Sequence, residues 1–343
     1  MAHMRNFCAH IKLMLFFLIV HHKDCVVECR EIQSYSSLRF FAIGDWGGQL
    51  FSPYTTKVER AVAKEMGIMA DYFKPDFILA LGDNFYTFGV RDVDDKRFQE
   101  TFEDVFTASS LHVPWYICAG NHDHYGNVSA EIAYSKKSSR WNFPDYNYTK
   151  IWTIPGSSST LQIVMIDTII LCGISESGDA AIRLQGMAQK SKRALEHWAW
   201  VERTLAKSSA NYLLVGGHYP VWSIAEHGPT ECLLKSLKPL LEKFHVTAYL
   251  SGHDHNLQHL DDGSGVQYIV SGCSNFVNNS TAHFNDVPKM SSKFFWADYS
   301  KLGGFATFRA TPDVMDMTFV DSRGASLYSI PLEPRILYSK VKF

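Results

Sequence analysis

The sequence predicts an α/β fold built on sheets, and three observations lead to this prediction. From residue 38 to about residue 252, short runs of β-forming apolar residues alternate with amphipathic stretches of helical length. The remaining C-terminal part has further strand-like runs separated by Gly, Asp and Pro, as in an antiparallel sheet. Hydrophobic residues make up 46% and charged residues 20% of the 343 residues, so the chain can bury a large core.

The expected strands are apolar and end at a glycine or another turn residue. They span residues 38–44, 76–82, 113–120, 161–167, 212–217, 246–252, 266–271, 304–310 and 314–320. Helices are expected at residues 53–73, 94–107, 190–207 and 230–243, and Pro53 suits the first position of its helix. No linker-like stretch interrupts this pattern, so residues 31–343 are expected to form a single domain.

Residues 1–30 have the pattern of a secretory signal peptide. Arg5, His10 and Lys12 precede the apolar run 13–20, which is too short to span a bilayer. A buried helix or an uncleaved anchor is the alternative, and cleavage is expected between residues 22 and 30. The protein is therefore expected to enter the secretory pathway without stable membrane insertion, and to be lysosomal or extracellular.

The charge balance excludes one class of function. Lys and Arg total 33 against 35 Asp and Glu, a formal charge of −2 with histidine neutral. Nucleic-acid-binding proteins usually carry a basic surplus or a basic stripe, so no nucleic-acid partner is expected. Nothing in the pattern favours an obligate oligomer, and a monomer is expected.

The cysteines fall into two kinds of sequence context. Cys118 and Cys273 end apolar strand-like runs and are expected to be buried thiols. Cys172 and Cys232 stand in polar contexts expected to be loops, which makes them the candidate disulfide of a secreted chain. No CxxC pair is present, so the sequence indicates neither a zinc ribbon nor a thioredoxin-type site.

Four N-x-S/T sequons, two of them overlapping, add to the secretory pattern. They begin at Asn127, Asn147, Asn278 and Asn279. In a secreted chain such sequons mark exposed loops that can be glycosylated.

A glycine followed by a polar side chain stands directly after each of five expected strands. Such strand ends are where α/β sheets place their active sites, and glycine allows the turn that lifts the next side chain off the sheet edge. The motifs are Gly44-Asp45-Trp46-Gly47, Gly82-Asp83-Asn84-Phe85-Tyr86, Gly120-Asn121-His122-Asp123, Gly217-His218-Tyr219-Pro220 and Gly252-His253-Asp254-His255.

The side chains of these motifs suit two metal ions. Two carboxylates, an amide, a phenol and three imidazoles provide oxygen ligands for a hard trivalent ion and nitrogen ligands for a borderline divalent one. A single Gly-Asp or Gly-His is usually only a turn, but five in order at strand ends favour a binuclear site. His253 and His255 are expected to point to the same side of an extended segment.

This order of motifs resembles that of the metallophosphoesterases. Gly47 stands where most members carry a histidine, and Tyr86 follows Asp83 by three residues, which is similar to the purple acid phosphatases of the small animal, tartrate-resistant type. The resemblance covers residues 38–332 and extends over 95–106, 120–134 and 217–230. It implies a metallophosphoesterase catalytic domain with a four-layer αββα sandwich of two mixed sheets flanked by helices.

The resemblance also implies the ligands of two metal ions. A ferric ion would be bound by Asp45, Tyr86, His255 and the bridging Asp83. A divalent ion, Fe, Zn or Mn, would be bound by Asn121, His218, His253 and the same Asp83.

Catalytic roles follow from the same resemblance. His122 and His227 are expected to donate to the phosphoryl oxygens and to protonate the leaving alkoxide. Asp123 is expected to orient His122, and Glu226 to hold a water molecule or share in proton delivery. His124 and His259 adjoin the motifs without an expected role.

Two structural features of the family match this sequence as well, and a third corresponds only in position. The resemblance implies a Cys172–Cys232 disulfide and glycosylation at Asn127. Residues 175–192 correspond to an exposed loop over the active site whose proteolysis raises activity in the family, although their sequence here is different.

The resemblance implies an acid phosphatase that hydrolyses phosphate monoesters by attack of metal-bound hydroxide at an Fe(III)–M(II) site. Phosphoproteins, nucleotides and small phosphate esters are the expected substrates. The alternatives are a manganese or zinc phosphodiesterase or protein phosphatase, and a non-catalytic anchoring homologue, which would be expected to have lost ligands. A redox role of a diiron site is a further alternative.

Overall fold

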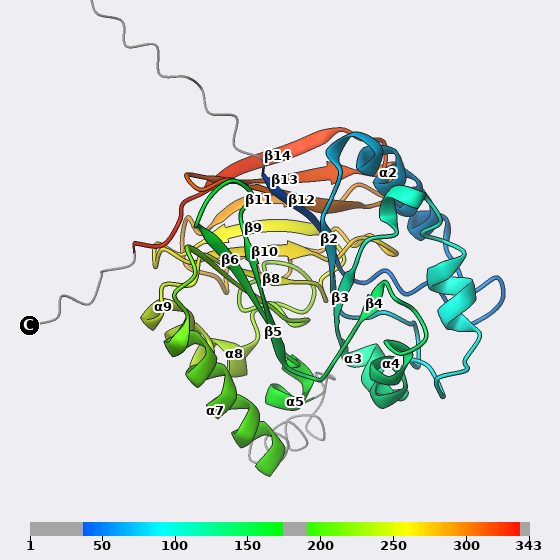
Figure 1. Cartoon of the computed structure of the whole chain (residues 1–343), viewed down its shortest axis with the longest axis horizontal. Coiled ribbons are helices and arrows are strands. Elements are labelled where there is room, and N and C mark those ends of the chain that lie inside the picture. The colour runs from blue at the N-terminus through cyan, green and yellow to red at the C-terminus, as the bar shows by residue number, and fades with distance from the viewer. Residues whose placement is uncertain (1–36, 174–190, 337–343) are drawn as a thin grey trace, which may run out of the picture. The chain divides into compact units, whose positions relative to one another are not determined.

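Two seven-stranded mixed sheets form the centre of the fold in the computed structural model, which describes residues 37–173 and 191–336 (Figure 1). The first sheet has the order β14-β13-β12-β1-β2-β3-β4, with β1 to β4 parallel and β12 to β14 antiparallel. Its strands are β1 (Leu38–Ile43), β2 (Phe77–Leu81), β3 (Trp115–Cys118), β4 (Trp141–Asn142), β12 (Gly304–Ala310), β13 (Met315–Asp321) and β14 (Ser326–Leu332).

The second sheet has the order β11-β9-β10-β8-β7-β6-β5. Strands β6, β7, β8 and β10 are parallel, whereas β5, β9 and β11 pair in antiparallel fashion. The strands are β5 (Tyr148–Thr153), β6 (Thr160–Met165), β7 (Tyr212–Gly216), β8 (Ala248–Ser251), β9 (Leu257–Asp261), β10 (Gln267–Ser271) and β11 (Ser292–Trp296).

Helices cover the outer faces of both sheets. The α-helices are α2 (Lys57–Phe73), α3 (Asn121–His124), α4 (Val128–Tyr134), α5 (Thr168–Cys172), α7 (Lys192–Lys207), α8 (Glu231–Ser236) and α9 (Lys238–Lys243). Figure 1 shows α2 on one side of the strands and α7, α8 and α9 on the other.

Successive side chains of each strand point to opposite faces of its sheet, so one set packs between the sheets and the other packs against the helices. In β1, Leu38, Phe40 and Ala42 belong to the core shared by the two sheets, while Phe41 and Ile43 pack with α2 on the outer face. On the second sheet, alternate residues of β7 face α7, α8 and α9. The predicted four-layer sandwich of two mixed sheets with flanking helices is therefore confirmed.

The helix expected from Pro53 begins four residues later. Thr56 caps α2 by accepting from the Glu59 N–H at 3.1 Å, and the Glu59 carboxylate accepts from the Thr56 N–H at 3.2 Å. This capping box satisfies the first free donors of the helix, so the N-terminus lies at Lys57.

Two other predicted helices are shorter than expected. Within 94–107 only Phe98–Glu103 is helical, with π-type bonds, because the Asp95 carboxylate holds the preceding turn through the N–H groups of Arg91 and Arg97. The helix expected at 230–243 divides into α8 and α9, and Pro239, which has no N–H, lies in the first turn of α9.

A cluster of aromatic side chains fixes the segment that follows β1. The ring of Trp46 lies 5.9 Å from Trp115, 6.1 Å from Trp141 and 5.7 Å from Phe102, measured between ring centroids. All four side chains are buried. Because Trp46 follows Asp45 directly, this packing helps to fix the position of the first motif.

The predicted disulfide is present, since Cys172 and Cys232 are bonded. Their expected loop contexts were wrong: Cys172 ends α5 and Cys232 lies in α8. Cys118 and Cys273 are free and buried, as predicted.

Several predictions concern residues that the structure does not describe. The predicted signal peptide, residues 1–30, and nearly all of the predicted loop 175–192 lie outside residues 37–173 and 191–336. The described residues belong to one unit, Tyr35–Phe343. No helix in the described part of the chain combines the length and the apolar character needed to cross a membrane.

We expect Phe102→Ala to lower the free energy of unfolding by about 3–5 kcal/mol, because it leaves a cavity among Trp46, Trp115 and Trp141. Urea denaturation measures this change. The control is Phe51→Ala at a side chain that is 74% exposed, for which we expect a change within about 0.5 kcal/mol. Equal losses in both variants would contradict this account of the cluster.

Candidate metal centre

The five predicted motifs meet at one edge of the two sheets. Asp45, Asp83 and Asn121 follow the carboxyl ends of the parallel strands β1, β2 and β3 of the first sheet. His218 and His253 follow β7 and β8 of the second sheet. Since the sheets pack face to face, these strand ends bring the polar side chains of both sheets together.

One group of side chains consists of Asp45, Tyr86 and His255. The phenol of Tyr86 donates to Oδ1 of Asp45 at 2.9 Å and lies 3.1 Å from Nε2 of His255. That nitrogen is in turn 3.6 Å from Oδ1 of Asp45. The three predicted terminal ligands of the ferric ion thus converge on one point.

A second group consists of Asp83, Asn121 and His218. Nε2 of His218 lies 2.9 Å from Oδ1 of Asn121 and 3.4 Å from Oδ1 of Asp83. Nδ1 of His218 lies 2.9 Å from the carbonyl oxygen of Leu81, which only accepts, so Nδ1 carries a proton. In a neutral imidazole, Nε2 then presents its lone pair toward two oxygen acceptors, and a cation among these three atoms would suit that arrangement.

Ligand atoms from both groups lie near one another. Those of Asp45, Asp83 and His218 all fall within 4.8 Å of each other, and all three residues are buried. The imidazole of His253 adjoins this cluster, with its ring 5.0 Å from that of His218. The predicted ligand residues are therefore brought together, and they form two groups rather than one.

Three of these residues have strained backbone conformations. Asp45, Asp83 and His253 have φ angles of 55°, 52° and 71°, in the left-handed region that non-glycine residues seldom adopt. Each such residue costs of the order of 1–3 kcal/mol, and such strain concentrates at functional sites. The sequence had suggested that the preceding glycines make the turn, and this is so for Gly82, whose φ angle is 91°. Gly44 and Gly252 do not have a positive φ, and there the left-handed residue is the predicted ligand itself.

Two of the motif glycines, Gly120 and Gly252, also allow a carboxylate to pack directly against the backbone. A Cβ at Gly120 would lie 2.2 Å from Oδ1 of Asp83, and one at Gly252 would lie 2.3 Å from Oδ2 of Asp45. Any larger residue at these two positions would push a carboxylate out of place.

The electrostatics of the site favour binding of a cation. Burial opposes ionisation of Asp83, but His218 and His122 outweigh it and lower the pKa of its carboxyl. Burial together with the carboxylates of Asp45 and Asp83 raises the pKa of the Tyr86 phenol well above its ordinary value. A phenolate ligand therefore requires a strongly charged ion beside it, as the predicted ferric site would supply.

His122 lies at the edge of both groups. Its backbone N–H donates to Oδ1 of Asp83 at 2.9 Å, and its Nδ1 lies 2.7 Å from the carbonyl oxygen of Thr87. Nε2 faces the site at 4.0 Å from Oδ2 of Asp83. The side chain is partly exposed, so a substrate can reach this nitrogen.

Asp123 does not orient His122 as predicted. Its buried carboxylate accepts instead from the backbone N–H groups of Asn84, Phe85 and Gly120. The Asn84 side chain also donates to it at 3.1 Å. Burial and the nearby Asp83 raise the pKa of Asp123 to about 7. Asp123 thus holds together the two loops that present Asp83 and Asn121.

His227 is anchored by a residue that the sequence analysis left without a role. The buried Asp254 carboxylate lies 2.9 Å from Nδ1 of His227 and accepts from its backbone N–H at 3.0 Å. The ring of His227 lies 4.0 Å from that of His253. Burial opposes protonation, but Asp254 outweighs it and raises the pKa of His227.

The two histidines of the last motif differ in orientation from the prediction. Residues 253–256 form bends rather than an extended segment, and the backbone of His253 is left-handed. His255 joins Asp45 and Tyr86, whereas His253 lies beside His218. One short motif therefore contributes to both groups.

The remaining predicted residues occupy the margin of the site or lie away from it. Glu226 is exposed and its carboxylate accepts from the side chain of Asn278. His124 pairs with the buried Asp167 at 2.7 Å. His259 lies on β9 and bonds to Tyr328 and Gln267, away from the metal-binding groups.

Asp254 and Asp167 are the residues that sequence reasoning missed. Asp254 stands between two predicted ligands, His253 and His255. The sequence analysis considered only those histidines and gave Asp254 no role, although it anchors His227. Asp167 ends the expected strand 161–167 as other motif residues do, but no glycine precedes it. A search for every carboxylate at a strand end would have found it.

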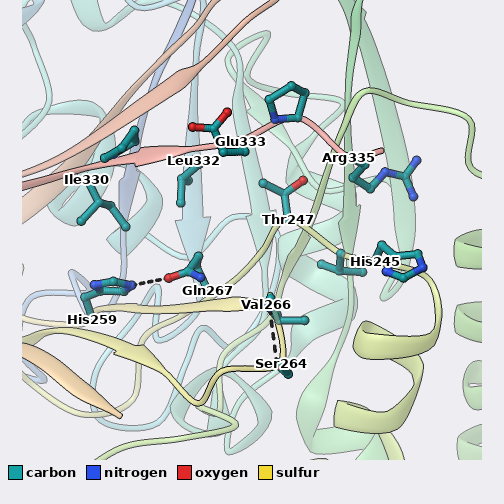
Figure 2. Close-up of a pocket in the computed structure, with 14 residues that line it drawn as sticks. His245, Thr247, His259, Ser264, Val266, Gln267, Ile330, Leu332, Glu333 and Arg335 are labelled. Atoms are coloured by element: carbon teal, nitrogen blue, oxygen red, sulfur yellow. Dashed lines mark hydrogen bonds between the residues drawn. The ribbon is translucent and has the colours of Figure 1, made fainter. Parts of the chain in front are cut away.

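A separate pocket lies at the other end of the second sheet. Its volume is about 390 Å³, and it is lined by residues of and next to β8, β9, β10 and β14. Figure 2 shows the lining residues, among them His245, Thr247 and Arg335. The motif residues follow the carboxyl ends of the parallel strands β7 and β8, whereas this pocket lies at their amino ends. It contains none of the predicted ligands.

Comparisons with known proteins agree with this geometry. Residues 38–257 match the calcineurin-like phosphoesterase family, and the chain belongs to that family. The tartrate-resistant acid phosphatase type 5 of Oryctolagus cuniculus is 51% identical over 319 residues, 93% of this chain and 97% of that protein. The Homo sapiens protein of the same name is 49% identical, with 87% and 92% covered. Within the family, the chain thus falls among the tartrate-resistant acid phosphatases.

Solved structures agree on the fold. GAP50, described as the anchor in the inner membrane complex of Plasmodium, gives a TM-score of 0.73 at 24% identity, with 88% of this chain and 90% of that chain covered. A purple acid phosphatase from yellow lupin seeds gives 0.61 at 16% identity, with 87% and 54% covered. At these identities the likeness concerns the fold alone.

The His124–Asp167 pair predicts a pH-dependent contribution to stability. Burial opposes protonation of His124, but Asp167 outweighs it and raises the pKa of His124, while the pKa of Asp167 is lowered. The histidine contribution is complete below its unfolded pKa of about 6.5 and is lost as pH rises through the folded value. The aspartate contribution is complete above about pH 3.9 and is lost as pH falls through its folded value.

We therefore expect His124→Gln to lower the free energy of unfolding by about 1–3 kcal/mol at pH 5.5 and by less at pH 9. Chemical denaturation at the two pH values measures this difference. The exposed His112 provides the control, since His112→Gln should cost little at either pH. A cost of His124→Gln that does not change with pH would contradict the charged pair.

Proposed function

We propose that this protein is an acid phosphatase that hydrolyses phosphate monoesters at a binuclear metal centre. One observation carries the proposal: Asp83 lies between two groups of ligands, one with the phenol of Tyr86 and one with the amide of Asn121. Oxygen-rich and nitrogen-rich donor sets side by side suit a hard trivalent ion and a borderline divalent ion.

Each ion has its own residues in this proposal. A ferric ion would be held by Asp45, Tyr86 and His255, and a divalent ion, Fe, Zn or Mn, by Asn121, His218 and His253. Asp83 would bridge the two ions. When bound, the ions would activate water as the nucleophile and neutralise charge on the phosphoryl group.

The protein's own side chains would perform the remaining work. Nε2 of His122 faces the site and would donate to a phosphoryl oxygen, because its Nδ1 already bonds the backbone of Thr87. His227, whose pKa is raised by Asp254, would carry a proton in mildly acidic solution and pass it to the leaving alkoxide. Asp254 would keep the imidazole pointing at the site.

The proposed substrates are phosphoproteins, nucleotides and small phosphate esters, and the enzyme would act as a monomer without a nucleic-acid partner. A protein that enters the secretory pathway and becomes lysosomal or extracellular suits the disulfide between Cys172 and Cys232. Glycosylation at Asn127 belongs to the same proposal. The Asn127 side chain is exposed and caps α4.

The alternatives fit the residues less well. A manganese or zinc phosphodiesterase or protein phosphatase would not require Tyr86 in the first group. A non-catalytic anchoring role, such as the one described for GAP50 of Plasmodium, would not require a full set of ligands. In this chain all seven proposed ligand positions carry a metal-binding side chain.

We expect the purified secreted protein to contain iron and to be violet or pink, because a tyrosinate bound to ferric iron absorbs visible light. Tyr86→Phe should abolish the visible band and preserve the far-ultraviolet circular dichroism. Tyr125→Phe, next to His122 but outside both ligand groups, should keep the colour. An unchanged spectrum in Tyr86→Phe, or a colourless wild-type protein with zinc or manganese, would refute the ferric site.

We expect His227→Asn to lower kcat by about 10²–10⁴-fold on substrates with poor leaving groups, because a proton donor is lost. Asp254→Asn should lower kcat less, and the double variant should be no worse than His227→Asn, because both residues act through one imidazole. His245→Asn, an exposed histidine at the other end of the sheet, is the control. Additive losses in the double variant would contradict the proposed coupling.

A further inference from the structure

Two overlapping glycosylation sequons lie at the rim of the metal centre. Asn278-Asn279-Ser280 and Asn279-Ser280-Thr281 share two residues. The backbone N–H of Asn278 donates to the carbonyl oxygen of His255 at 2.8 Å, so this segment is attached to the last motif. Phe276, two residues earlier, has its ring 4.9 Å from Tyr86 and 5.3 Å from His255.

The two asparagines present their side chains differently. Asn278 is half-buried, and its Nδ2 donates to the carboxylate of Glu226, next to His227. A sugar on this nitrogen would extend toward the catalytic groups. Asn279 is exposed, and only its Oδ1 has a partner among the described residues, the Tyr299 hydroxyl at 3.3 Å. A sugar on its Nδ2 would extend into solvent.

We propose that Asn279 carries an N-linked glycan in the folded protein, and that this glycan limits the access of large phosphorylated substrates to the metal centre. The donor is a polyisoprenyl-pyrophosphate-linked oligosaccharide of the secretory pathway. Nδ2 of Asn279 forms a bond to the anomeric carbon of the first sugar, and the bond from that carbon to the pyrophosphate oxygen breaks. The pyrophosphate leaves with the lipid, and one amide proton is released.

The effect on substrates follows from the position of the glycan. Asn279 adjoins Asn278, which contacts both Glu226 and the His255 backbone, and consecutive Cα atoms are only about 3.8 Å apart. A bulky, hydrated oligosaccharide so close to the exposed Glu226 and His227 obstructs a folded phosphoprotein but leaves room for a small ester. This consequence rests on the proposed phosphatase activity, whereas the modification itself does not.

The overlapping sequons allow a matched pair of variants. Thr281→Ala removes the sequon at Asn279 and keeps the one at Asn278, whereas Asn278→Gln does the reverse. The full-length chain is expressed in a secretory eukaryotic host and treated with a glycosidase that converts a glycosylated asparagine to aspartate. Peptide mass spectrometry then reads residues 278 and 279 separately.

We expect the conversion at Asn279 in the wild type and in Asn278→Gln, and its absence in Thr281→Ala. Thr281→Ser, which keeps the sequon, should restore it. An unmodified Asn279 in the secreted wild type, or a glycan on Asn278 instead, overturns the assignment. If such an unmodified protein still hydrolyses phosphate esters, the proposed function survives the loss of the glycan assignment.

Kinetics test the consequence for substrate choice. We expect Thr281→Ala to raise kcat/KM several-fold for a folded phosphoprotein such as ovalbumin and to leave it unchanged for p-nitrophenyl phosphate. Thr281→Ser should behave as the wild type. An unchanged ratio of the two substrates in glycan-free Thr281→Ala overturns the gating role. A glycosylated protein without activity on either substrate refutes the proposed function and leaves the modification intact.

Discussion

The arrangement of the site depends on one buried carboxylate, that of Asp83. It accepts from the His122 backbone, lies beside His218 and contributes to the raised pKa of Tyr86. Its backbone is held in a left-handed conformation, which must be stabilised by its surroundings. The loop-bridging carboxylate of Asp123 supplies part of that support through the N–H groups that follow Asp83. A buried charge at this edge of the sheets therefore favours a backbone N–H donor and an imidazole beside it, and disfavours ionisation of the Tyr86 phenol.

The two sheets explain why such a centre exists at this place. Their shared core aligns the carboxyl ends of β1, β2 and β3 with those of β7 and β8, so both sheets contribute to one edge. Neither sheet alone provides both groups of proposed ligands, since Asp45, Asp83 and Asn121 come from the first and His218 and His253 from the second. The proposed ions can therefore be bound by the full set of residues only when the two sheets are packed together. The aromatic cluster around Trp46 supports the same edge from the outer face.

Much of the fold and most of the site could be predicted because strong local patterns mark them. Buried strands are short apolar runs, and the polar residues that follow five of these runs, those of β1, β2, β3, β7 and β8, meet at the site. The edge strands β5, β11 and β14 were missed because half-exposed strands have no distinct apolar period. The two-residue strand β4 and the buried strand β9 were also missed. The role of Asp254 and the true partners of Asp123 depend on contacts between distant segments, which one sequence does not reveal. The same is true of the bends that separate His253 from His255.

The disulfide has a consequence for the connectivity of the chain. Cys172 precedes the predicted loop 175–192 and Cys232 follows it, with a sequence separation of 60 between the two half-cystines. A protease that cuts anywhere in that interval produces two polypeptides that stay covalently joined. Strands β6 and β7, which belong to the two different pieces when the cut falls in the predicted loop, also remain paired in one sheet. The molecule can therefore exist as a two-chain protein that separates only when it is both reduced and unfolded.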